Sequence, residues 1–262
     1  MPRAEGTFQD NWRLDGRVAV VTGGAGGIGR AICMALGGAG ASVVVADRSL
    51  ERSEHVAAQL ARSSITAAGY GLDVTDERAV DALFGAVAQS LGAVQVLVNC
   101  AGIALRAPAL EHTLDNWNKV LAVNVTGTFL CSRAAARGML AHGGGSIINI
   151  ASVMGLSGGG LYPNISYQTS KGAVVNMTRA LALEWAKQGI RVNAIAPTYV
   201  KTDFIKPLMD DPALRARIEA MTPLGRIAEP EDIVGAALFL ASPASSMVTG
   251  HVLAVDGGFL AQ

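Results

Sequence analysis

A tyrosine and a lysine stand four residues apart in the segment YQTSK, at Tyr167 and Lys171, and Ser152 ends the segment INIAS fifteen residues upstream of the tyrosine. A phenol has an ordinary pKa of about 10 and is a poor base at neutral pH. A cationic amine nearby favours the phenolate and lowers that pKa. Residues four apart share one face of a helix, so Lys171 can act on Tyr167. With a Ser152 hydroxyl that can hydrogen-bond a substrate oxygen, the three residues predict a site that moves a proton.

Each of these residues also has an ordinary structural interpretation. Tyr167 can be a surface aromatic, Lys171 a solvated charge and Ser152 a helix cap. Taken singly, that interpretation is the commoner one. Taken together, downstream of a glycine-rich loop suited to a nucleotide, the residues favour proton transfer.

That loop is the segment TGGAGGIG, residues 22–29, which follows a β-branched run and precedes an amphipathic helical pattern. Gly23, Gly27 and Gly29 let the backbone turn tightly and approach a pyrophosphate at the positive N-terminus of the helix. Their spacing differs from the usual G-x-G-x-x-G, because three residues separate the first pair and one separates the second. The position between a strand and a helix favours a dinucleotide site over a simple tight turn.

Asp47 ends the second apolar run, eighteen residues after Gly29. A carboxylate there can accept both hydroxyls of an adenosine ribose and would repel a 2′-phosphate. Residues 24–26 offer no basic side chain against that repulsion, although the adjacent Arg48 could turn toward a phosphate. Asp47 as a cap of the next helix is the alternative. Its position and charge together favour NAD over NADP.

Elements of two kinds must position these side chains, and they alternate along the chain. Helical periodicity fills the intervals between apolar runs, and the helix that holds Tyr167 is expected to reach about Gln188, where Gly189 ends it. The alternation predicts an α/β fold, a single-domain Rossmann fold with a doubly wound, seven-stranded parallel sheet and helices on both faces. The predicted strands are 17–23, 42–47, 67–74, 94–102, 146–152, 191–197 and 251–258.

No linker, charge run or change of composition divides the chain into two domains. Residues 1–13 are expected to form a polar N-terminal arm, and residues 14–262 the domain. The irregular segment 198–229 is rich in Pro, Asp and Arg and falls between the last two predicted strands. Such a segment is expected to form a substrate lid over the C-terminal edge of the sheet.

Bulk properties exclude several classes of protein. Half of the 262 residues are hydrophobic and only 16% are charged, which suits a wide buried sheet and excludes disorder. The net charge is zero and no basic run occurs, so neither nucleic acid nor an anionic membrane surface is expected as a partner. The apolar stretches are broken before the roughly 18 residues of a membrane span, and the start lacks the apolar core of a secretory signal.

Three cysteines, Cys33, Cys100 and Cys131, are widely spaced and lack a CxxC pair or a histidine cluster. They fit neither a zinc site nor a disulfide framework, and reduced core cysteines in a cytoplasmic protein are the expected state. Near the C-terminus, Phe259 and Leu260 have too little chain after them to be covered locally, so an interface is expected there.

The segments TGGAGGIG, VNCAG, AVNVTG with Asn124, the Ser152 position and YQTSK together resemble the short-chain dehydrogenase/reductase family. The resemblance covers nearly the whole chain, from about residue 14 to the end. It implies a Rossmann-type domain with seven parallel strands, usually in a homotetramer. It also implies an NAD-dependent oxidoreductase that moves a hydride between a secondary alcohol and nicotinamide.

The resemblance assigns roles residue by residue. It makes Tyr167 the general acid/base and Lys171 the partner that lowers its pKa and binds the nicotinamide ribose. It makes Ser152 the residue that orients the reacting oxygen, and Asn124 the holder of a water that links Lys171 to solvent as a proton relay. The cofactor residues that it implies are Gly23, Gly27, Ile28, Gly29, Asp47, Asp73, Val74, Asn99, Ala101, Gly102, Tyr167, Lys171, Pro197, Val200 and Thr202.

The chain departs from the family pattern at two positions. Thr198 replaces the glycine usual after Pro197, which leaves the local backbone path open, and Cys100 replaces an asparagine in the turn after the fourth strand. Some relatives hold a divalent metal near the C-terminal residue. Gln262 could serve here, but no carboxylate cluster supports it, so no metal is predicted.

Substrate choice is expected to come from residues 103–112, 153–166 and 198–222. The segment 153–166 is glycine-rich and nearly uncharged, with Asn164 and Ser166 as hydrogen-bonding candidates, while Arg106, Lys201 and Lys206 stand in the other two. A neutral polyhydroxy substrate is favoured, as in relatives that oxidise sugar alcohols or reduce ketoses. A sugar-acid dehydrogenase and a reductase of small ketones or 3-oxoacyl thioesters are alternatives. A catalytically silent dinucleotide-binding sensor is the alternative from another class, and the intact four catalytic residues argue against it.

Overall fold

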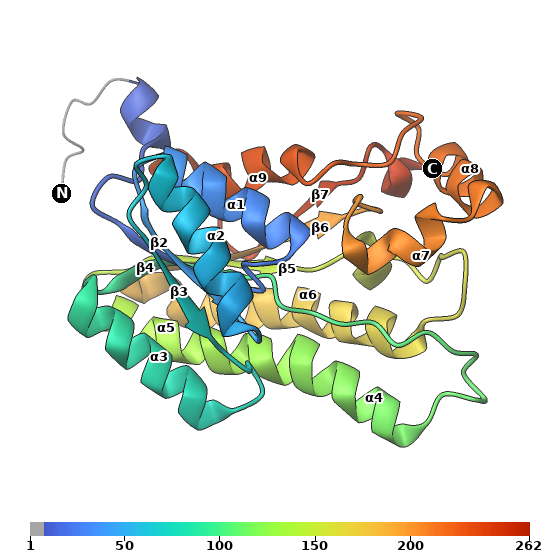
Figure 1. Ribbon diagram of the computed structural model, residues 1–262, viewed down its shortest axis with the longest axis horizontal. Helices are drawn as coiled ribbons and strands as arrows, with labels where there is room; N and C mark the ends of the chain where they lie inside the picture. The colour runs from blue at the N-terminus through green and yellow to red at the C-terminus, as the bar shows by residue number, and fades with distance from the viewer. Residues whose placement is uncertain (1–7) are drawn as a thin grey trace.

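A computed structural model describes residues 8–262, and residues 1–7 of the predicted arm lie outside the described part (Figure 1). Within that part, seven strands form one parallel sheet in the order β3-β2-β1-β4-β5-β6-β7. The strand order reverses between β1 and β4, which confirms the predicted doubly wound topology. The strands are β1 (Val18–Thr22), β2 (Ser42–Asp47), β3 (Ala67–Gly71), β4 (Val94–Asn99), β5 (Gly145–Ile150), β6 (Ile190–Pro197) and β7 (Val252–Val255).

Helices cover both faces of this sheet, as Figure 1 shows. The helices are α1 (Gly27–Gly38), α2 (Leu50–Arg62), α3 (Glu77–Ser90), α4 (Leu114–Leu121), α5 (Thr128–Ala141), α6 (Ile165–Trp185), α7 (Lys206–Met209), α8 (Pro212–Ala220) and α9 (Glu231–Ala241). Shorter turns are η1 (Phe8–Trp12), η2 (Ala122–Gly127), η3 (Val153–Gly155), η4 (Ala186–Gln188), η5 (Asp203–Ile205), η6 (Pro243–Ser245) and η7 (Phe259–Ala261). Of these, η2 is a π-helical turn that joins α4 to α5.

The strand β2 shows why the sheet needs two helical layers. Its side chains alternate between the faces: Val43 and Val45 pack with α1, α2 and α9, whereas Val44 and Ala46 pack with the layer of α3, α5 and α6. All four are fully buried, because both faces of a parallel sheet are covered. A strand that is buried on both faces is therefore expected to show a continuous apolar run in the sequence, as β2 does.

Four predicted strands end two or three residues before their predicted bounds: the third at Gly71, the fourth at Asn99, the fifth at Ile150 and the seventh at Val255. The third strand ends at Gly71 because Asp73 forms a turn, in which its Oδ1 accepts from Thr75 N at 2.9 Å. The fourth ends at Asn99, where Cys100 N donates to Thr22 O at 3.2 Å, and the chain then enters the turn predicted to contact the cofactor.

Three other expectations need correction. The segment 198–229 is not irregular, because it contains η5, α7 and α8. Residues 8–12 of the predicted arm form η1, and the Trp12 ring lies 5.9 Å from the Phe239 ring of α9. Phe259 and Leu260 are partly buried, and Phe259 packs against the apolar cluster of the 198–229 segment, so the chain itself covers part of Phe259.

Candidate active site

The carboxyl ends of the strands open into a cleft of about 870 Å³. The register aligns Thr22 of β1 with Ala46 of β2 and with Asn99 of β4, so these strands end at one edge of the sheet. Loops that follow the strand ends form the walls of the cleft. Ligands of open α/β sheets bind at such an edge, where the strand order reverses.

The glycine-rich loop after β1 forms one end of the cleft. Its backbone can pack this closely against its neighbours only because the glycines have no side chains. Gly23 has a positive φ of +64°, and a Cβ there would lie 2.8 Å from Ala101 N. A Cβ on Gly29 would lie 2.2 Å from Gly23 O, and one on Gly27 would lie 2.4 Å from Thr202 Cγ2. The first turn of α1 has no side-chain cap, so its N–H groups remain directed at the loop. This bare cradle fits a pyrophosphate.

Asp47 lines the same end of the cleft, as predicted. Its Oδ2 accepts from Ala25 N at 3.3 Å, which ties the carboxylate to the glycine-rich loop. Arg48 and Arg52 line the cleft beside it, and Arg52 Nη2 donates to Ala25 O at 3.1 Å. The prediction did not include Arg52. Arg52 lies in the first turn of α2, three residues after the N-cap Ser49, and no motif in the sequence marks it.

Most of the predicted cofactor residues line the cleft, and they come from six separate segments of the chain. One does not. Asn99 is buried, and its Nδ2 donates to Ser132 Oγ and to Asn149 Oδ1, each at 2.9 Å. Its side chain therefore joins β4 to α5 and β5 behind the wall, which corrects the expectation of a cofactor contact from this side chain. The lining residues among those predicted are Gly23, Gly27, Ile28, Gly29, Asp47, Asp73, Val74, Ala101, Gly102, Tyr167, Lys171, Pro197, Val200 and Thr202.

Ser152, Tyr167 and Lys171 lie together in the wall of the cleft. Ser152 follows β5 and its side chain acts to lower the pKa of the Tyr167 phenol, while its Oγ accepts from Met154 N at 3.1 Å. The Lys171 Nζ lies 5.6 Å from the centre of the Tyr167 ring and donates to Ile150 O at 2.6 Å. The helix α6 thus brings the phenol and the amine to one face, as the spacing predicted.

The pKa of Tyr167 departs from the expectation. Burial raises the pKa of Tyr167 to about 12, against the opposing effects of the Ser152 hydrogen bond and the Arg106 charge. Burial also lowers the pKa of Lys171 to about 8. The expected lowering of the Tyr167 pKa is therefore not observed, because desolvation is the largest effect on the phenol.

Asn124 lies behind the wall, in the π-helical turn η2. Its Oδ1 accepts from Ile103 N at 2.8 Å, and its Nδ2 donates to Ile103 O and to Ser170 Oγ, each at 2.9 Å. Such π-helical turns are rare and occur often at functional sites. Thr198, the residue in place of the usual glycine, has no positive φ, so its side chain is accommodated without backbone strain.

Aromatic side chains line the opposite end of the cleft, around one guanidinium. The Arg106 guanidinium lies 5.1 Å from the Tyr162 ring centre and 5.6 Å from that of Phe204, and its Nη2 donates to Phe204 O at 3.3 Å. The Phe204 ring lies 5.8 Å from the Tyr167 ring. The prediction did not include Tyr162, Tyr199 or Phe204 as lining residues, because no motif marks them in their loops.

Two of the three cations expected near the substrate have other partners. Lys201 pairs with Glu229, and Lys206 Nζ lies 3.7 Å from Asp210 Oδ1. Neither lysine lines the cleft, whereas Arg106 does and forms no salt bridge with a described residue. Arg106 is therefore the cation that these three segments place in the cleft.

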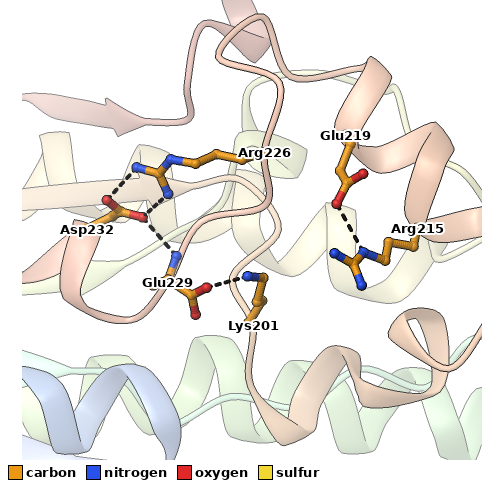
Figure 2. Close-up of polar contacts among 6 residues, drawn as sticks. All are labelled: Lys201, Arg215, Glu219, Arg226, Glu229 and Asp232. Atoms are coloured by element: carbon orange, nitrogen blue, oxygen red, sulfur yellow. Dashed lines mark hydrogen bonds and ion pairs between the residues drawn. The ribbon is translucent and has the colours of Figure 1, made fainter. Parts of the chain in front are cut away.

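The two ends of the 198–229 segment are joined to each other, as the Lys201–Glu229 pair in Figure 2 shows. Val200 forms a parallel β-bridge with Ala228, next to the Lys201–Glu229 pair. The Arg226 guanidinium binds Asp232 at the start of α9, with an Nη2–Oδ1 distance of 2.7 Å, and Glu229 N donates to Asp232 Oδ2 at 2.8 Å. These contacts form a closed neck, so α7 and α8 lie in one excursion of the chain.

Within residues 8–262, no three His, Cys, Asp or Glu side chains come together as metal ligands, and the three cysteines are free. In the same part of the chain, no helix is long and apolar enough to cross a membrane.

Comparisons with known proteins agree with this geometry. A family model described as Enoyl-(Acyl carrier protein) reductase matches residues 23–260. Galactitol 2-dehydrogenase (L-tagatose-forming) of Cereibacter sphaeroides is 46% identical over 96% of this chain and 98% of its own. D-threitol dehydrogenase of Mycolicibacterium smegmatis is 42% identical over 95% of each chain.

A solved structure is similar to this chain in fold as well as in sequence. It is a gluconate 5-dehydrogenase from Burkholderia cenocepacia J2315 in complex with NADP and tartrate, with a TM-score of 0.93, 37% identity and coverage of 97% of this chain and 99% of the other. The resemblance noted in the sequence is thereby confirmed. The chain belongs to the short-chain dehydrogenase/reductase family, as an oxidoreductase that acts on secondary alcohols with a nicotinamide cofactor.

Proposed function

We propose that the protein is an NAD-dependent dehydrogenase of a polyol or sugar derivative, with Tyr167 as the general acid/base. One observation carries this proposal. Tyr167 and Ser152 line the same cleft as the bare glycine cradle, so a dinucleotide in that cradle can extend toward them. Galactitol and threitol, which name two relatives, support a polyol as the substrate.

When bound, the nicotinamide ring supplies the acceptor and donor of a hydride. Ser152 Oγ orients the substrate oxygen, and Tyr167 Oη exchanges a proton with it, a contribution worth roughly 10²–10⁴-fold in rate. With a pKa of about 12, Tyr167 is protonated at neutral pH, the state that protonates a ketone during reduction. In the direction of alcohol oxidation, the Lys171 charge favours the phenolate that accepts the proton.

Asn124 has a supporting role in this proposal. It lies behind Lys171 and holds the water through which the proton reaches solvent. Its Oδ1 accepts from Ile103 N, which leaves that oxygen a second lone pair for the water. The segment 198–229 acts as a lid, since Thr202, Phe204 and Ile205 within it line the cleft.

The preference for NAD over NADP rests on Asp47. Its carboxylate lines the ribose end of the cleft, where it can accept ribose hydroxyls and repel a 2′-phosphate. Arg48 and Arg52 beside it favour the opposite choice, and the gluconate 5-dehydrogenase structure contains NADP. We expect kcat/KM to favour NAD in the wild type and to move toward NADP in Asp47→Ser. A wild type that prefers NADP would overturn this part of the proposal.

A sugar acid is the second candidate substrate, and Arg106 is the observation that favours it. An unpaired guanidinium in the cleft can bind a carboxylate, a bond worth roughly 10- to 100-fold in affinity. Turnover of galactitol, threitol and gluconate by the wild type and by Arg106→Met separates the two candidates. Loss confined to gluconate in the variant supports a sugar acid, whereas equal effects on all three support a neutral polyol. Lys206→Met, which removes a cation outside the cleft, is the control.

The same assay, extended to small ketones and a 3-oxoacyl thioester, tests the remaining alternatives. Turnover of the thioester alone would support a reductase of that class. Cofactor binding without turnover of any compound would support a sensor. We further propose a homotetramer in the cytoplasm, a compartment that the three free cysteines support.

A further inference from the structure

Ser170 is a fully buried hydroxyl in the helical turn between Tyr167 and Lys171, and it does not line the cleft. Its Oγ donates to Tyr167 O at 2.7 Å and accepts from Asn124 Nδ2 at 2.9 Å. A serine hydroxyl has one hydrogen to donate, so its donor is used within α6 and its acceptor is used by η2. The hydroxyl thus joins two elements that approach the site from different parts of the chain.

The amide of Asn124 depends on this hydroxyl for its contact with α6. Its other two side-chain hydrogen bonds both go to the backbone of Ile103, in the loop after β4. Asn124 is nearly fully buried, so an amide hydrogen without a partner would be costly there. The hydrogen bond to Ser170 therefore holds the Asn124 NH₂ group toward α6.

Nothing but a glycine stands between this amide and Lys171. A Cβ placed on Gly102 would lie 3.3 Å from Asn124 Oδ1 and 3.6 Å from Lys171 Nζ. The orientation of the amide therefore sets which polar atom lies near the ammonium group. A rotation of the amide would place an N–H group near that cation and weaken its surroundings.

We infer that Ser170 is a positioning residue, which holds the Asn124 amide in register with the turn of α6 that carries Tyr167 and Lys171. This inference rests on the proposed roles of those residues in proton transfer. Ser170 itself touches neither substrate nor cofactor. Its loss is expected to slow the movement of the proton and to leave the cofactor cradle unchanged.

The same helix contains a matched control eight residues farther along. Thr178 is also fully buried, its Oγ1 donates to Val174 O at 2.8 Å, and it accepts from Asn149 Nδ2 at 2.9 Å. The chemistry repeats that of Ser170, with an asparagine amide, a helical hydroxyl and a helical carbonyl. Thr178 does not line the cleft, and neither does Asn149. Removal of the Thr178 hydroxyl therefore removes the same kind of buried hydrogen bonds as removal of the Ser170 hydroxyl, at a place that has no proposed part in proton transfer.

The experiment compares Ser170→Ala with Thr178→Val, using the best substrate of the wild type. In Ser170→Ala, kcat should fall by about tenfold to a hundredfold while KM for the cofactor changes by less than about twofold. The solvent deuterium isotope effect on kcat should rise, because the proton step becomes slower. In Thr178→Val, kcat, KM for the cofactor and the isotope effect should all match the wild type. Ser170→Thr, which keeps a hydroxyl, should retain much of the wild-type kcat.

Hydrogen exchange gives a readout independent of turnover. Amide exchange in residues 103 and 122–127 should become faster in Ser170→Ala and remain unchanged in Thr178→Val. Equal kinetics and equal exchange in the two variants would show that Ser170 is merely structural. Tyr167→Phe, measured in parallel, separates the hypotheses: an active Tyr167→Phe refutes the proposed function, whereas an inactive one with Ser170→Ala like Thr178→Val refutes only this inference.

Discussion

At the scale of single residues, the site contains a lysine that reduces the stability of the protein. Lys171 is 5% exposed, and its burial lowers its pKa from an ordinary 10.5 to about 8. At neutral pH it is charged in both the folded and the unfolded chain, so the folded state bears the full desolvation penalty. Its hydrogen bond to Ile150 O offsets a part of that penalty. The proposed function accounts for such a residue, because its charge lies close to the Tyr167 ring.

The first prediction concerns Lys171→Met, which should be inactive yet more stable than the wild type at pH 7, by about 1–3 kcal/mol. Between pH 8 and pH 10, unfolded chains hold the lysine proton that the folded protein has released. The stability of the wild type therefore rises with pH in that window, and its difference from the variant shrinks. Urea unfolding at pH 7 and pH 9.5 measures both effects. A variant less stable than the wild type at pH 7 would contradict this account.

Sequence reasoning predicted that Tyr167 and Lys171 lie together, but it did not predict the direction of the Tyr167 pKa shift. The spacing in YQTSK correctly placed Tyr167 and Lys171 on one face of α6. It could not show how deeply each group is buried, and burial determines the pKa of Tyr167. Arg106, noted in the sequence among three candidate cations, was singled out only by the structure, because its partners are aromatic rings far away in the chain.

At the scale of elements, the neck of the 198–229 segment contains the Lys201–Glu229 and Arg226–Asp232 pairs of Figure 2 and adjoins residues that line the cleft. The Lys201–Glu229 pair joins the two ends of the segment directly before Thr202 and Asp203, which line the cleft. Arg215 and Glu219 form a comparable exposed pair, but within α8. The two pairs share their chemistry and differ in whether they join the ends of the lid.

The second prediction compares Glu229→Gln with Glu219→Gln. Each variant removes one exposed ion pair, so each should change the free energy of unfolding by less than about 1 kcal/mol. Only Glu229→Gln should raise KM for the substrate, by roughly threefold, because the neck loosens. Steady-state kinetics on both variants decides the matter. An equal KM in the two would show that the neck does not position the lid.

Elements of the sheet were predictable from the sequence because continuous β-branched runs such as 42–47 fill its buried strands. The second strand has the predicted bounds, Ser42–Asp47. The π-helical turn of η2 was not predicted, since its residues fit an α-helical pattern equally well. The helices α7 and α8 were interpreted as irregular chain because Pro207 and Pro212 interrupt the pattern, although Pro is tolerated in the first turn of a helix.

At the scale of the whole molecule, α4, α5 and α6 lie in one helical layer (Figure 1), and several of their apolar side chains are exposed. Leu114 is 73% exposed on α4 and Leu183 is 84% exposed on α6, while Phe129 and Leu140 of α5 are also exposed. Large apolar side chains gathered on one layer are typical of an association surface. They support the proposed homotetramer on a face different from the C-terminal one expected from the sequence.

The third prediction is that sedimentation velocity at micromolar concentration gives the mass of four chains. Leu183→Arg should reduce that mass, because a charge replaces an apolar contact. Met247→Arg, at another highly exposed apolar position outside these helices, should leave it unchanged. A wild type that sediments only as a monomer would refute the tetramer.

The central claim is that the Tyr167 hydroxyl moves the substrate proton beside the bound dinucleotide. The most direct measurement is the turnover of Tyr167→Phe together with its cofactor affinity, determined by titration calorimetry. The account predicts a loss of activity of about 10²-fold or more, with cofactor affinity within about twofold of the wild type. A variant that retains more than about a tenth of wild-type turnover would contradict the claim, since general acid–base catalysis is worth far more than that.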